Sequence, residues 1–215
     1  MKHLLIIGAG GFGREMFAAA REAVGYGTDF DIKGFLDDRP DALAAFVGYP
    51  SVVGSLADYR PEPDDVFISA IGNIATRRRC VSVLSAKGGR FISIVHRSAS
   101  LGPNVTVGVG TFIGHNAVLT ADVRVGDHVS IFQNTSLGHD TVLGDYSHVY
   151  AQCALGGAIR IGAGTAIYPG ARITPRRTIG ENAVVGIGSV VLLDIPANAT
   201  VFGNPAAIIN PTGSF

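Results

Sequence analysis

The chain has few cysteines and no excess of either sign of charge. Its 215 residues include 17 Lys and Arg against 17 Asp and Glu, and the only basic run is Arg77-Arg78-Arg79. Such a balance argues against binding to nucleic acid, which needs a positive surface. The two cysteines, Cys80 and Cys153, lie far apart, and neither belongs to a CxxC motif. We therefore expect free thiols in a reducing compartment and no disulfide framework.

The chain also lacks a hydrophobic run long enough to cross a membrane. The short apolar run at residues 3–7 leads directly into a Gly-rich stretch, so it resembles neither a membrane span nor a signal peptide with its cleavage site. We expect a cytoplasmic protein. Hydrophobic residues make up 47% of the chain, which is enough for a sizeable core, and the length fits one or two domains.

The second half of the chain contains an unbroken six-residue repeat. An aliphatic residue stands at every sixth position from 101 to 191, and ten of these sixteen residues are followed by Gly. Six residues can form one short strand and one corner, because a strand alternates its side chains between two faces. The period predicts a parallel β-helix. The aliphatic residues are Leu101, Val107, Ile113, Leu119, Val125, Ile131, Leu137, Leu143, Val149, Leu155, Ile161, Ile167, Ile173, Ile179, Val185 and Val191.

Three such sides would close a triangular coil of eighteen residues. The repeat would then give roughly five coils in a prism about 25 Å tall. We expect the Gly after each aliphatic residue either to take a positive φ at the corner or to let neighbouring coils approach closely. Since the phase never slips, no long loop is expected to leave the prism between residues 101 and 191.

The first ninety residues predict alternating strands and helices. We expect strands at residues 3–7, 32–36, 52–53 and 66–71, and helices at 14–24 and 74–86, and residues 91–95 lead to the first coil of the repeat. This alternation predicts an α/β domain built like half of a dinucleotide-binding fold. Ninety residues are too few for both halves and a substrate domain, so a single nucleotide, for example one carrying a sugar, suits this domain better than a nicotinamide dinucleotide.

The turn after the first predicted strand is rich in glycine. Bare amides at the start of a helix suit an anion, and Asp37 and Asp38 end the next strand, where carboxylates can accept from a ribose or a base edge. The pattern is weak evidence by itself, so a tight turn without a ligand and a pair of solvated carboxylates stay open. Residues 77–79 are typical of a solvated helix face rather than of a phosphate clamp. The glycines of the turn are Gly8, Gly10, Gly11 and Gly13.

Three stretches carry a family resemblance. They are GAGGFGRE at residues 8–15 with FLDD at 35–38, the six-residue repeat, and the tail DIPAN at 194–198 with GNPA at 203–206. Together they resemble the sugar O-acyltransferase or sialic acid O-acetyltransferase-like family of left-handed β-helix acyltransferases, and are similar to bacterial nucleotide-sugar N-acetyltransferases. The resemblance implies an α/β half-Rossmann-like domain followed by a left-handed parallel β-helix. We expect a nucleotide-sugar-binding domain at 1–90, an acyltransferase domain at 91–195, and a tail near the acyl-CoA site at 196–215.

The resemblance also implies site residues. In the family a histidine followed by an acidic residue lies beside a cleft between subunits, and the match here is His139 as general base with Asp140. His139 comes just after a Gly corner, so we expect it to project from an edge of the prism and not into the core. Phe132 departs from the pattern, because many relatives carry Asn there, and this bears on how the acceptor is held. Implied substrate contacts are the four glycines of the turn with Phe12, Asp37, Asp38, Asn73, Phe132, Asn134 and His148, and implied acyl-CoA contacts are Gly157, Gly186, Asn204 and Pro205.

The activity that the resemblance implies is acetyl-CoA-dependent N-acetylation of a nucleotide-linked amino sugar for a surface polysaccharide or glycan. The amine would attack the thioester directly, in a homotrimer and without a metal. Two alternatives stay open: O-acetylation of a sugar of the sialic acid type, and a non-catalytic solenoid that binds a nucleotide sugar.

A metal enzyme of the carbonic anhydrase kind is disfavoured. The spacings of 24 residues from His115 to His139 and of nine from His139 to His148 do not match an eighteen-residue coil. Cys153 is expected to be a small packing residue of the repeat rather than a nucleophile.

Overall fold

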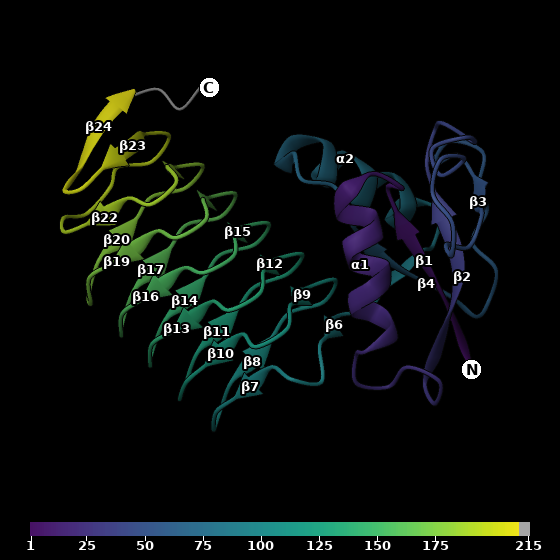
Figure 1. The fold of residues 1–215 in the computed structure, drawn as a ribbon, viewed down its shortest axis with the longest axis horizontal. Coiled ribbons are helices and arrows are strands. Elements are labelled where there is room, and N and C mark those ends of the chain that lie inside the picture. The colour runs from purple at the N-terminus through teal and green to yellow at the C-terminus, as the bar shows by residue number, and fades with distance from the viewer. Residues whose placement is uncertain (211–215) are drawn as a thin grey trace. The chain divides into compact units, whose positions relative to one another are not determined.

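The computed structural model describes residues 1–210, which form two compact units, one from Met1 to Arg97 and one that begins at Ser98 (Figure 1). The functional boundaries expected at residues 90 and 195 stay a prediction. Within the expected tail, residues 211–215 lie outside the described part of the chain.

The N-terminal unit is a parallel sheet with the strand order β3-β2-β1-β4-β5. Since β1 lies between β2 and β4, the chain order reverses beside it, and the carboxyl ends of strands at such a point are where open parallel sheets bind ligands. The predicted half-Rossmann-like domain is confirmed. Its elements are β1 Lys2–Ile7, α1 Gly11–Arg21, β2 Phe30–Leu36, β3 Val52–Gly54, β4 Asp65–Ser69, α2 Ile74–Ala86, β5 Arg90–Phe91 and β6 Ile94–Val95.

The first helix does not have the predicted bounds. It begins at Gly11 instead of residue 14, because the Gly-rich turn itself forms the first helical turn: Arg14 N donates to the carbonyl of Gly10 at 3.0 Å. It ends at Arg21 instead of residue 24. Beyond it Gly25 and Gly27 take positive φ values of 85° and 78°, which turn the chain towards β2.

The prediction of a solvated face at residues 77–79 is wrong for Arg77. This side chain is 1% exposed, and its Nε and Nη2 donate to the carbonyl of Ile71 at 2.9 and 2.8 Å. Arg78 and Arg79 are exposed. A helix has 3.6 residues per turn, so three consecutive side chains cannot all share its solvent face.

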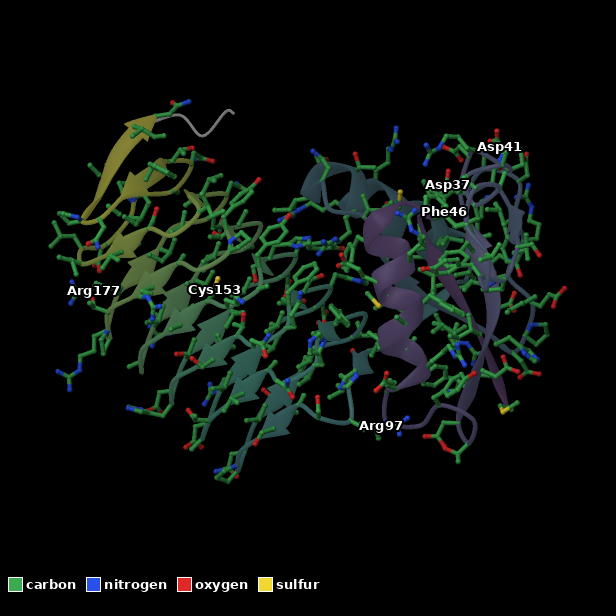
Figure 2. All side chains as sticks on the ribbon, viewed as in Figure 1. Asp37, Asp41, Phe46, Arg97, Cys153 and Arg177 are labelled. Atoms are coloured by element: carbon green, nitrogen blue, oxygen red, sulfur yellow. The ribbon has the colours of Figure 1, made fainter. Side chains whose placement is uncertain are left out.

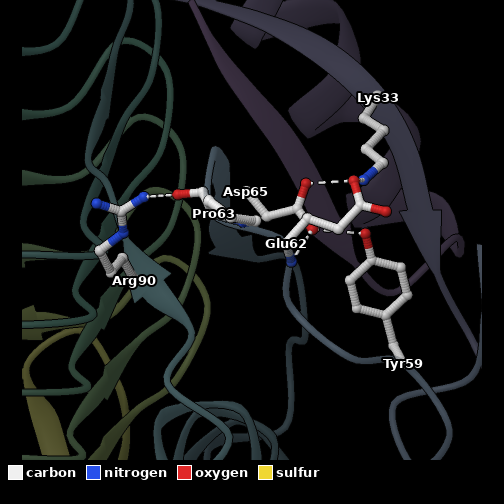
Figure 3. Close-up of polar contacts among 6 residues, drawn as sticks. All are labelled: Lys33, Tyr59, Glu62, Pro63, Asp65 and Arg90. Carbon is white, nitrogen blue, oxygen red and sulfur yellow. Dashed lines mark hydrogen bonds and ion pairs between the residues drawn. The ribbon is translucent and has the colours of Figure 1, made fainter.

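A buried acidic network joins β2, β4 and the segment between β3 and β4 (Figure 3). The Asp65 side chain has no exposed surface, and its Oδ1 accepts from Lys33 Nζ at 2.8 Å. Its Oδ2 accepts from the Tyr59 hydroxyl at 2.7 Å and from Glu62 N at 2.8 Å. Burial by itself raises the pKa of Asp65, but the hydrogen bonds from Lys33, Glu62 N–H and Tyr59 outweigh burial and hold that pKa below its ordinary value.

Asp65→Asn should lower the free energy of unfolding at neutral pH by about 3 kcal/mol, because Lys33 then lacks its buried anionic partner. The folded-state pKa of Asp65 lies below its unfolded value, so the contribution is present above the unfolded pKa and is lost as pH falls through the folded pKa. Denaturant unfolding from about pH 7 to about pH 3 should show the difference from wild type shrinking in acid. Glu62→Gln, the exposed acid of the network, should cost less than about 1 kcal/mol. A difference that stays constant with pH would contradict this assignment.

The second unit contains three sheets of stacked strands, and the strands from β7 to β22 are two residues long (Figure 1). Their orders are β22-β19-β16-β13-β10-β7, β20-β17-β14-β11-β8 and β24-β23-β21-β18-β15-β12-β9. Partners among the strands from β7 to β22 lie eighteen residues apart, as in Leu119↔Leu137 and Ile131↔Val149, which confirms the predicted β-helix. The strands are β7 Ser100–Leu101, β8 Thr106–Val107, β9 Phe112–Ile113, β10 Val118–Leu119, β11 Arg124–Val125, β12 Ser130–Ile131, β13 Ser136–Leu137, β14 Val142–Leu143, β15 His148–Val149, β16 Ala154–Leu155, β17 Arg160–Ile161, β18 Ala166–Ile167, β19 Arg172–Ile173, β20 Thr178–Ile179, β21 Val184–Val185, β22 Val190–Val191, β23 Thr200–Gly203 and β24 Ala206–Asn210.

Close approach of the coils, and not a positive φ, explains the Gly that follows so many aliphatic residues. None of those ten glycines has a positive φ. A Cβ at Gly144, for example, would lie 2.6 Å from Ala163 N in the next coil. The left-handed corner falls two residues later, at residues such as Asn104 (φ 58°), Asn116 (φ 54°) and Asp140 (φ 60°). Asn, Asp and Gly suit this conformation best.

Gly144→Ala should lower the free energy of unfolding by about 2 kcal/mol or more, because the added methyl group meets the backbone of the next coil. Gly188→Asn is the matched control, since Gly188 stands at a left-handed corner (φ 64°) with open space around it. The control should change the melting temperature little. Equal losses in the two variants would show that the close approach of coils is not what Gly144 permits.

Candidate functional site

His139 and Asp140 form an exposed pair at one corner of the β-helix, directly after β13 and Gly138. His139 Nδ1 lies 2.7 Å from Asp140 Oδ2, and the two side chains are 68% and 62% exposed. The backbone around them is held from both neighbouring coils: Asp140 N donates to Ala121 O at 3.0 Å, and His139 O accepts from Ala158 N at 2.6 Å. The predicted projection of His139 from an edge of the prism is confirmed.

The imidazole of His139 lies over Gly157. A Cβ at Gly157 would come within 2.5 Å of His139 Nε2, so only glycine leaves room for the ring in this position. Asp140 engages Nδ1, and Nε2 is the ring nitrogen left to act on a substrate. A carboxylate on one nitrogen of an imidazole fixes its tautomer and stabilises the imidazolium that forms when the other nitrogen takes a proton.

The left-handed corner by itself explains why an acidic residue suits position 140, but it does not explain why that residue contacts His139. Asp122 occupies the equivalent left-handed corner one coil earlier (φ 61°), and its Oδ1 accepts from Asn104 Nδ2 at 2.9 Å. Asp140 contacts the neighbouring histidine. Of two corner carboxylates in the same sheet edge, Asp140 is the one arranged for proton transfer.

Phe132 lies in a column of stacked rings on a different sheet. Its ring centroid is 5.1 Å from that of Tyr150 and 5.9 Å from that of His148, and Phe112 meets it edge-on at 5.7 Å. His148 is 1% exposed and Phe132 is 7% exposed. The aromatic stack explains why a phenyl ring fits at 132. Asn134 takes the next corner (φ 56°), and its Oδ1 accepts from Asn116 Nδ2 at 3.4 Å.

The same column continues towards the C-terminus and ends at a small apolar cavity. Tyr168 stacks on Tyr150 at 5.0 Å, and the ring of Phe202 on β23 lies against Gly186, where any Cβ would collide with it. Asn204 and Pro205, joined by a cis peptide bond, form the turn between β23 and β24. The cavity measures about 440 Å³ and is lined by Tyr168, Gly186, Ile187, Phe202 and Ile209. Gly186 therefore lies near the predicted tail contacts, whereas Gly157 lies under His139.

A second cavity, of about 520 Å³, opens at the carboxyl ends of β1 and β2 in the N-terminal unit. Of the predicted residues, Gly8, Asp37 and Asp38 line it. The sequence reasoning missed Thr76 and Arg79, although their spacing on α2 with Cys80 and Val83 is that of one helix face. The full lining is Ile7, Gly8, Leu36, Asp37, Asp38, Arg39, Leu56, Ala57, Ile71, Thr76, Arg79, Cys80 and Val83.

The glycines beside this cavity have different roles. Gly8 takes a φ of 96°, and Gly13 packs so tightly on the carbonyl of Gly8 that no side chain fits there. Gly10 and Gly11 face open space, and no side chain caps the start of α1 at Gly10. The first two therefore shape the turn, and the second two leave its amides approachable.

Two other predicted residues of this unit also stabilise local structure. Asp37 Oδ2 accepts from Ala9 N at 2.8 Å, and its Oδ1 accepts from Arg39 N at 3.0 Å. Burial by itself raises the pKa of Asp37, but these hydrogen bonds and the Arg39 guanidinium hold that pKa below its ordinary value. Asn73 is the N-cap of α2, where its Oδ1 accepts from Thr76 N at 2.9 Å.

Cys153 lies inside the β-helix, and Figure 2 labels it among the coils. Both Cys80 and Cys153 are free and buried, and Cys153 is 1% exposed at the inward small position of the repeat. Burial raises the pKa of Cys153 to about 11. A thiol of this kind is a packing residue and not a nucleophile.

In the native protein at about pH 8, Cys153 should react with a thiol reagent at least about a hundred times more slowly than a free thiol, because burial disfavours its thiolate. Titration before and after unfolding checks this, and both thiols should react after unfolding. Cys153→Ala should keep the catalytic rate within about twofold. Rapid native labelling of Cys153 would contradict the burial.

Among residues 1–210 no cluster of three or more His, Cys, Asp and Glu side chains is placed to hold a metal ion. No helix within the same range is long and apolar enough to cross a membrane.

Comparison with known proteins agrees with this geometry. Residues 3–84 match the family described as the PglD N-terminal domain. The acetyltransferase domain of PglB from Neisseria gonorrhoeae FA1090, in complex with acetyl coenzyme A, is 31% identical over 97% of this chain and 99% of that one, with a TM-score of 0.86. A mutant perosamine N-acetyltransferase from Caulobacter crescentus, in complex with CoA and GDP-perosamine, is 28% identical over 97% of each chain, with a TM-score of 0.87.

A curated relative matches over a shorter span. UDP-N-acetylbacillosamine N-acetyltransferase from Bacillus subtilis (strain 168) is 32% identical over 117 residues, which are 53% of this chain and 51% of that protein. The match thus spans about half the length of that relative. With the full-length structural matches, it shows that the chain belongs to the hexapeptide-repeat acyltransferases of nucleotide sugars, with a PglD-type N-terminal domain and a left-handed β-helix.

Proposed function

We propose that the protein is an acetyl-CoA-dependent N-acetyltransferase that acts on a nucleotide-linked amino sugar in the cytoplasm, for a surface polysaccharide or glycan. The observation that carries the proposal is the exposed His139–Asp140 pair, with 2.7 Å between Nδ1 and Oδ2 and with the ring over Gly157. Relatives of known structure that hold acetyl coenzyme A, or CoA with GDP-perosamine, support it.

In this proposal His139 is the general base. The sugar amine attacks the thioester carbonyl, and Nε2 takes the proton that the nitrogen loses as the new C–N bond forms. Asp140 accepts from Nδ1–H and stabilises the imidazolium. The carbon–sulfur bond then breaks, and the departing CoA thiolate takes the proton back from Nε2. No covalent bond to the enzyme is needed, because one cleft holds both substrates.

The cavity of the N-terminal unit would hold the nucleotide. Gly10 and Gly11 leave bare amides at the uncapped start of α1, which suits a phosphate. Arg39 and Arg79 add positive charge at the cavity lining, and Asp38 is exposed there to accept from a base or ribose. Phe12, Asn73, Phe132, Asn134 and His148 stay proposed substrate contacts, and Gly157, Gly186, Asn204 and Pro205 stay proposed acyl-CoA contacts.

The assembly we propose is a homotrimer with a site between each pair of neighbouring β-helices. The exposure of His139 and Asp140, 68% and 62%, leaves room for a second copy to close the cleft. Light scattering should give three protomers for the active species.

His139→Ala should lower kcat by at least about a hundredfold, since it removes the base, while leaving the melting temperature unchanged because the side chain is exposed. Asp140→Asn should lower kcat less, because Nε2 remains. The measurement is CoA release, followed with a thiol reagent. His115→Ala is the matched control, because His115 is an exposed histidine two residues after the aliphatic position of its own strand, as His139 is. Near-wild-type turnover in His139→Ala would rule out this mechanism.

The acceptor is identified by offering UDP-, GDP- and dTDP-linked amino sugars with acetyl-CoA. CoA release with one of them, lost in His139→Ala and absent with the matched sugar that has a hydroxyl group in place of the amine, would establish N-acetylation. Equal release with that matched sugar would indicate the O-acetyltransferase alternative. Tight binding of a nucleotide sugar without release of CoA would indicate a non-catalytic solenoid.

A further inference from the structure

The chain has only three lysines, Lys2, Lys33 and Lys87, and two of them hold the same segment. Lys87 follows the last residue of α2, and its ammonium group donates to the carbonyls of Leu56, Ala57 and Tyr59 at 2.8, 2.5 and 3.2 Å. An ammonium group has three hydrogens, so these three carbonyls use all of its donors.

The segment from Ser55 to Glu62 that Lys87 holds is organised from its other side as well. Tyr59 N donates to Ser55 O at 3.0 Å, which closes a turn. The hydroxyl of Tyr59 donates to the buried Asp65 at 2.7 Å, and Lys33 pairs with Asp65 and with Glu62 (Figure 3). Tyr59 is therefore bound through its hydroxyl to the Lys33 network and through its carbonyl to Lys87.

This segment forms one wall of the cavity in the N-terminal unit. Leu56 and Ala57 line the cavity from this wall, and Thr76, Arg79 and Val83 line it from α2. Lys87 belongs to the α2 side and binds the carbonyls of Leu56 and Ala57 themselves. It does not line the cavity, yet its hydrogen bonds join the two walls.

We infer that Lys87 is a positioning residue for nucleotide binding. Its hydrogen bonds fix the wall formed by Leu56 and Ala57 relative to α2, and so keep the cavity at the width that a nucleotide needs. The inference rests on the proposed function, in which this cavity holds the nucleotide of the substrate. Replacing the ammonium group frees three carbonyls and lets the wall move, without removing any group that contacts the thioester or the acceptor amine.

The test compares Lys87→Met with Lys2→Met. Methionine keeps the length of the side chain and removes the ammonium group, and Lys2 is an exposed lysine on the first strand. Calorimetric titration with UDP, GDP and dTDP should show about tenfold or more weaker binding for Lys87→Met, as expected from the loss of charge-assisted hydrogen bonds. Binding by Lys2→Met should equal that of wild type. Lys87→Arg, which restores a cation with several donors, should recover most of the affinity.

Kinetics separates positioning from a general loss of structure. In Lys87→Met the KM for the nucleotide sugar should rise about tenfold, while kcat at saturation and the KM for acetyl-CoA stay within about twofold of wild type. A fall in kcat with unchanged KM for the nucleotide sugar would overturn the inference. If wild type binds none of the three nucleotides, the proposed function fails. If wild type binds one and Lys87→Met binds it equally well, only the role of Lys87 fails.

The role of Lys87 can also be tested in the wild-type protein, which keeps the inference testable even if Lys87→Met does not fold. Acetylation of amines by a water-soluble reagent, read out by mass spectrometry, should be slow at Lys87 and fast at Lys2. Addition of the nucleotide that binds should slow the reaction at Lys87 further and leave Lys2 unchanged. Equal rates at Lys87 with and without the nucleotide would overturn the inference.

Discussion

The stacking of one coil on the next by backbone hydrogen bonds is the interaction on which the β-helix depends. Each coil donates to the one eighteen residues away, as Gly138 N does to Leu155 O at 2.9 Å. At the glycines that follow ten of the aliphatic residues, a Cβ would collide with the next coil, which explains why Gly is frequent there. The same hydrogen bond also forms where a side chain is present, as from Phe132 N to Val149 O at 2.8 Å. The regular stacking makes every corner a rigid position, held by the coils on either side.

The candidate catalytic pair uses this rigidity. The backbone of His139 and Asp140 is bonded both to Ala121 and to Ala158, so the pair cannot shift without breaking contacts to two coils. The left-handed corner that favours an acidic residue at 140 turns its carboxylate to the imidazole beside it. The imidazole lies over Gly157, where a side chain would collide with it, and the His139 side chain is 68% exposed. A rigid scaffold of this kind positions a base without needing a buried site.

The cavity of the N-terminal unit is lined by separate parts of the chain, which must be held in place relative to one another. The carboxyl ends of the strands contribute Gly8 to the lining, and α2 contributes Arg79. The segment that carries Leu56 has no regular structure of its own to hold it in place. Charged side chains hold it instead: Lys33 acts through Asp65, and Lys87 acts directly on the backbone.

The sequence predicted much of this architecture and less of the site. The six-residue period was enough to predict the β-helix and the exposure of His139, because a strict period leaves each side chain only one direction in which to point. The bounds of α2 also matched. The bounds of α1 were wrong, because a Gly-rich turn can itself form the first turn of a helix. Arg77 was predicted to be exposed, because nothing in a run of three arginines indicates which side chain is buried and donates to the carbonyl of Ile71.

The sequence by itself therefore determined the β-helix, the order of the two units and the adjacency of His139 and Asp140, because each depends on local spacing. Only the tertiary structure decided that the ring of His139 covers Gly157, that Phe132 joins an aromatic column, and that Lys87 holds the wall of the cavity. These contacts join residues far apart in the chain, and their geometry follows from packing that no local pattern encodes.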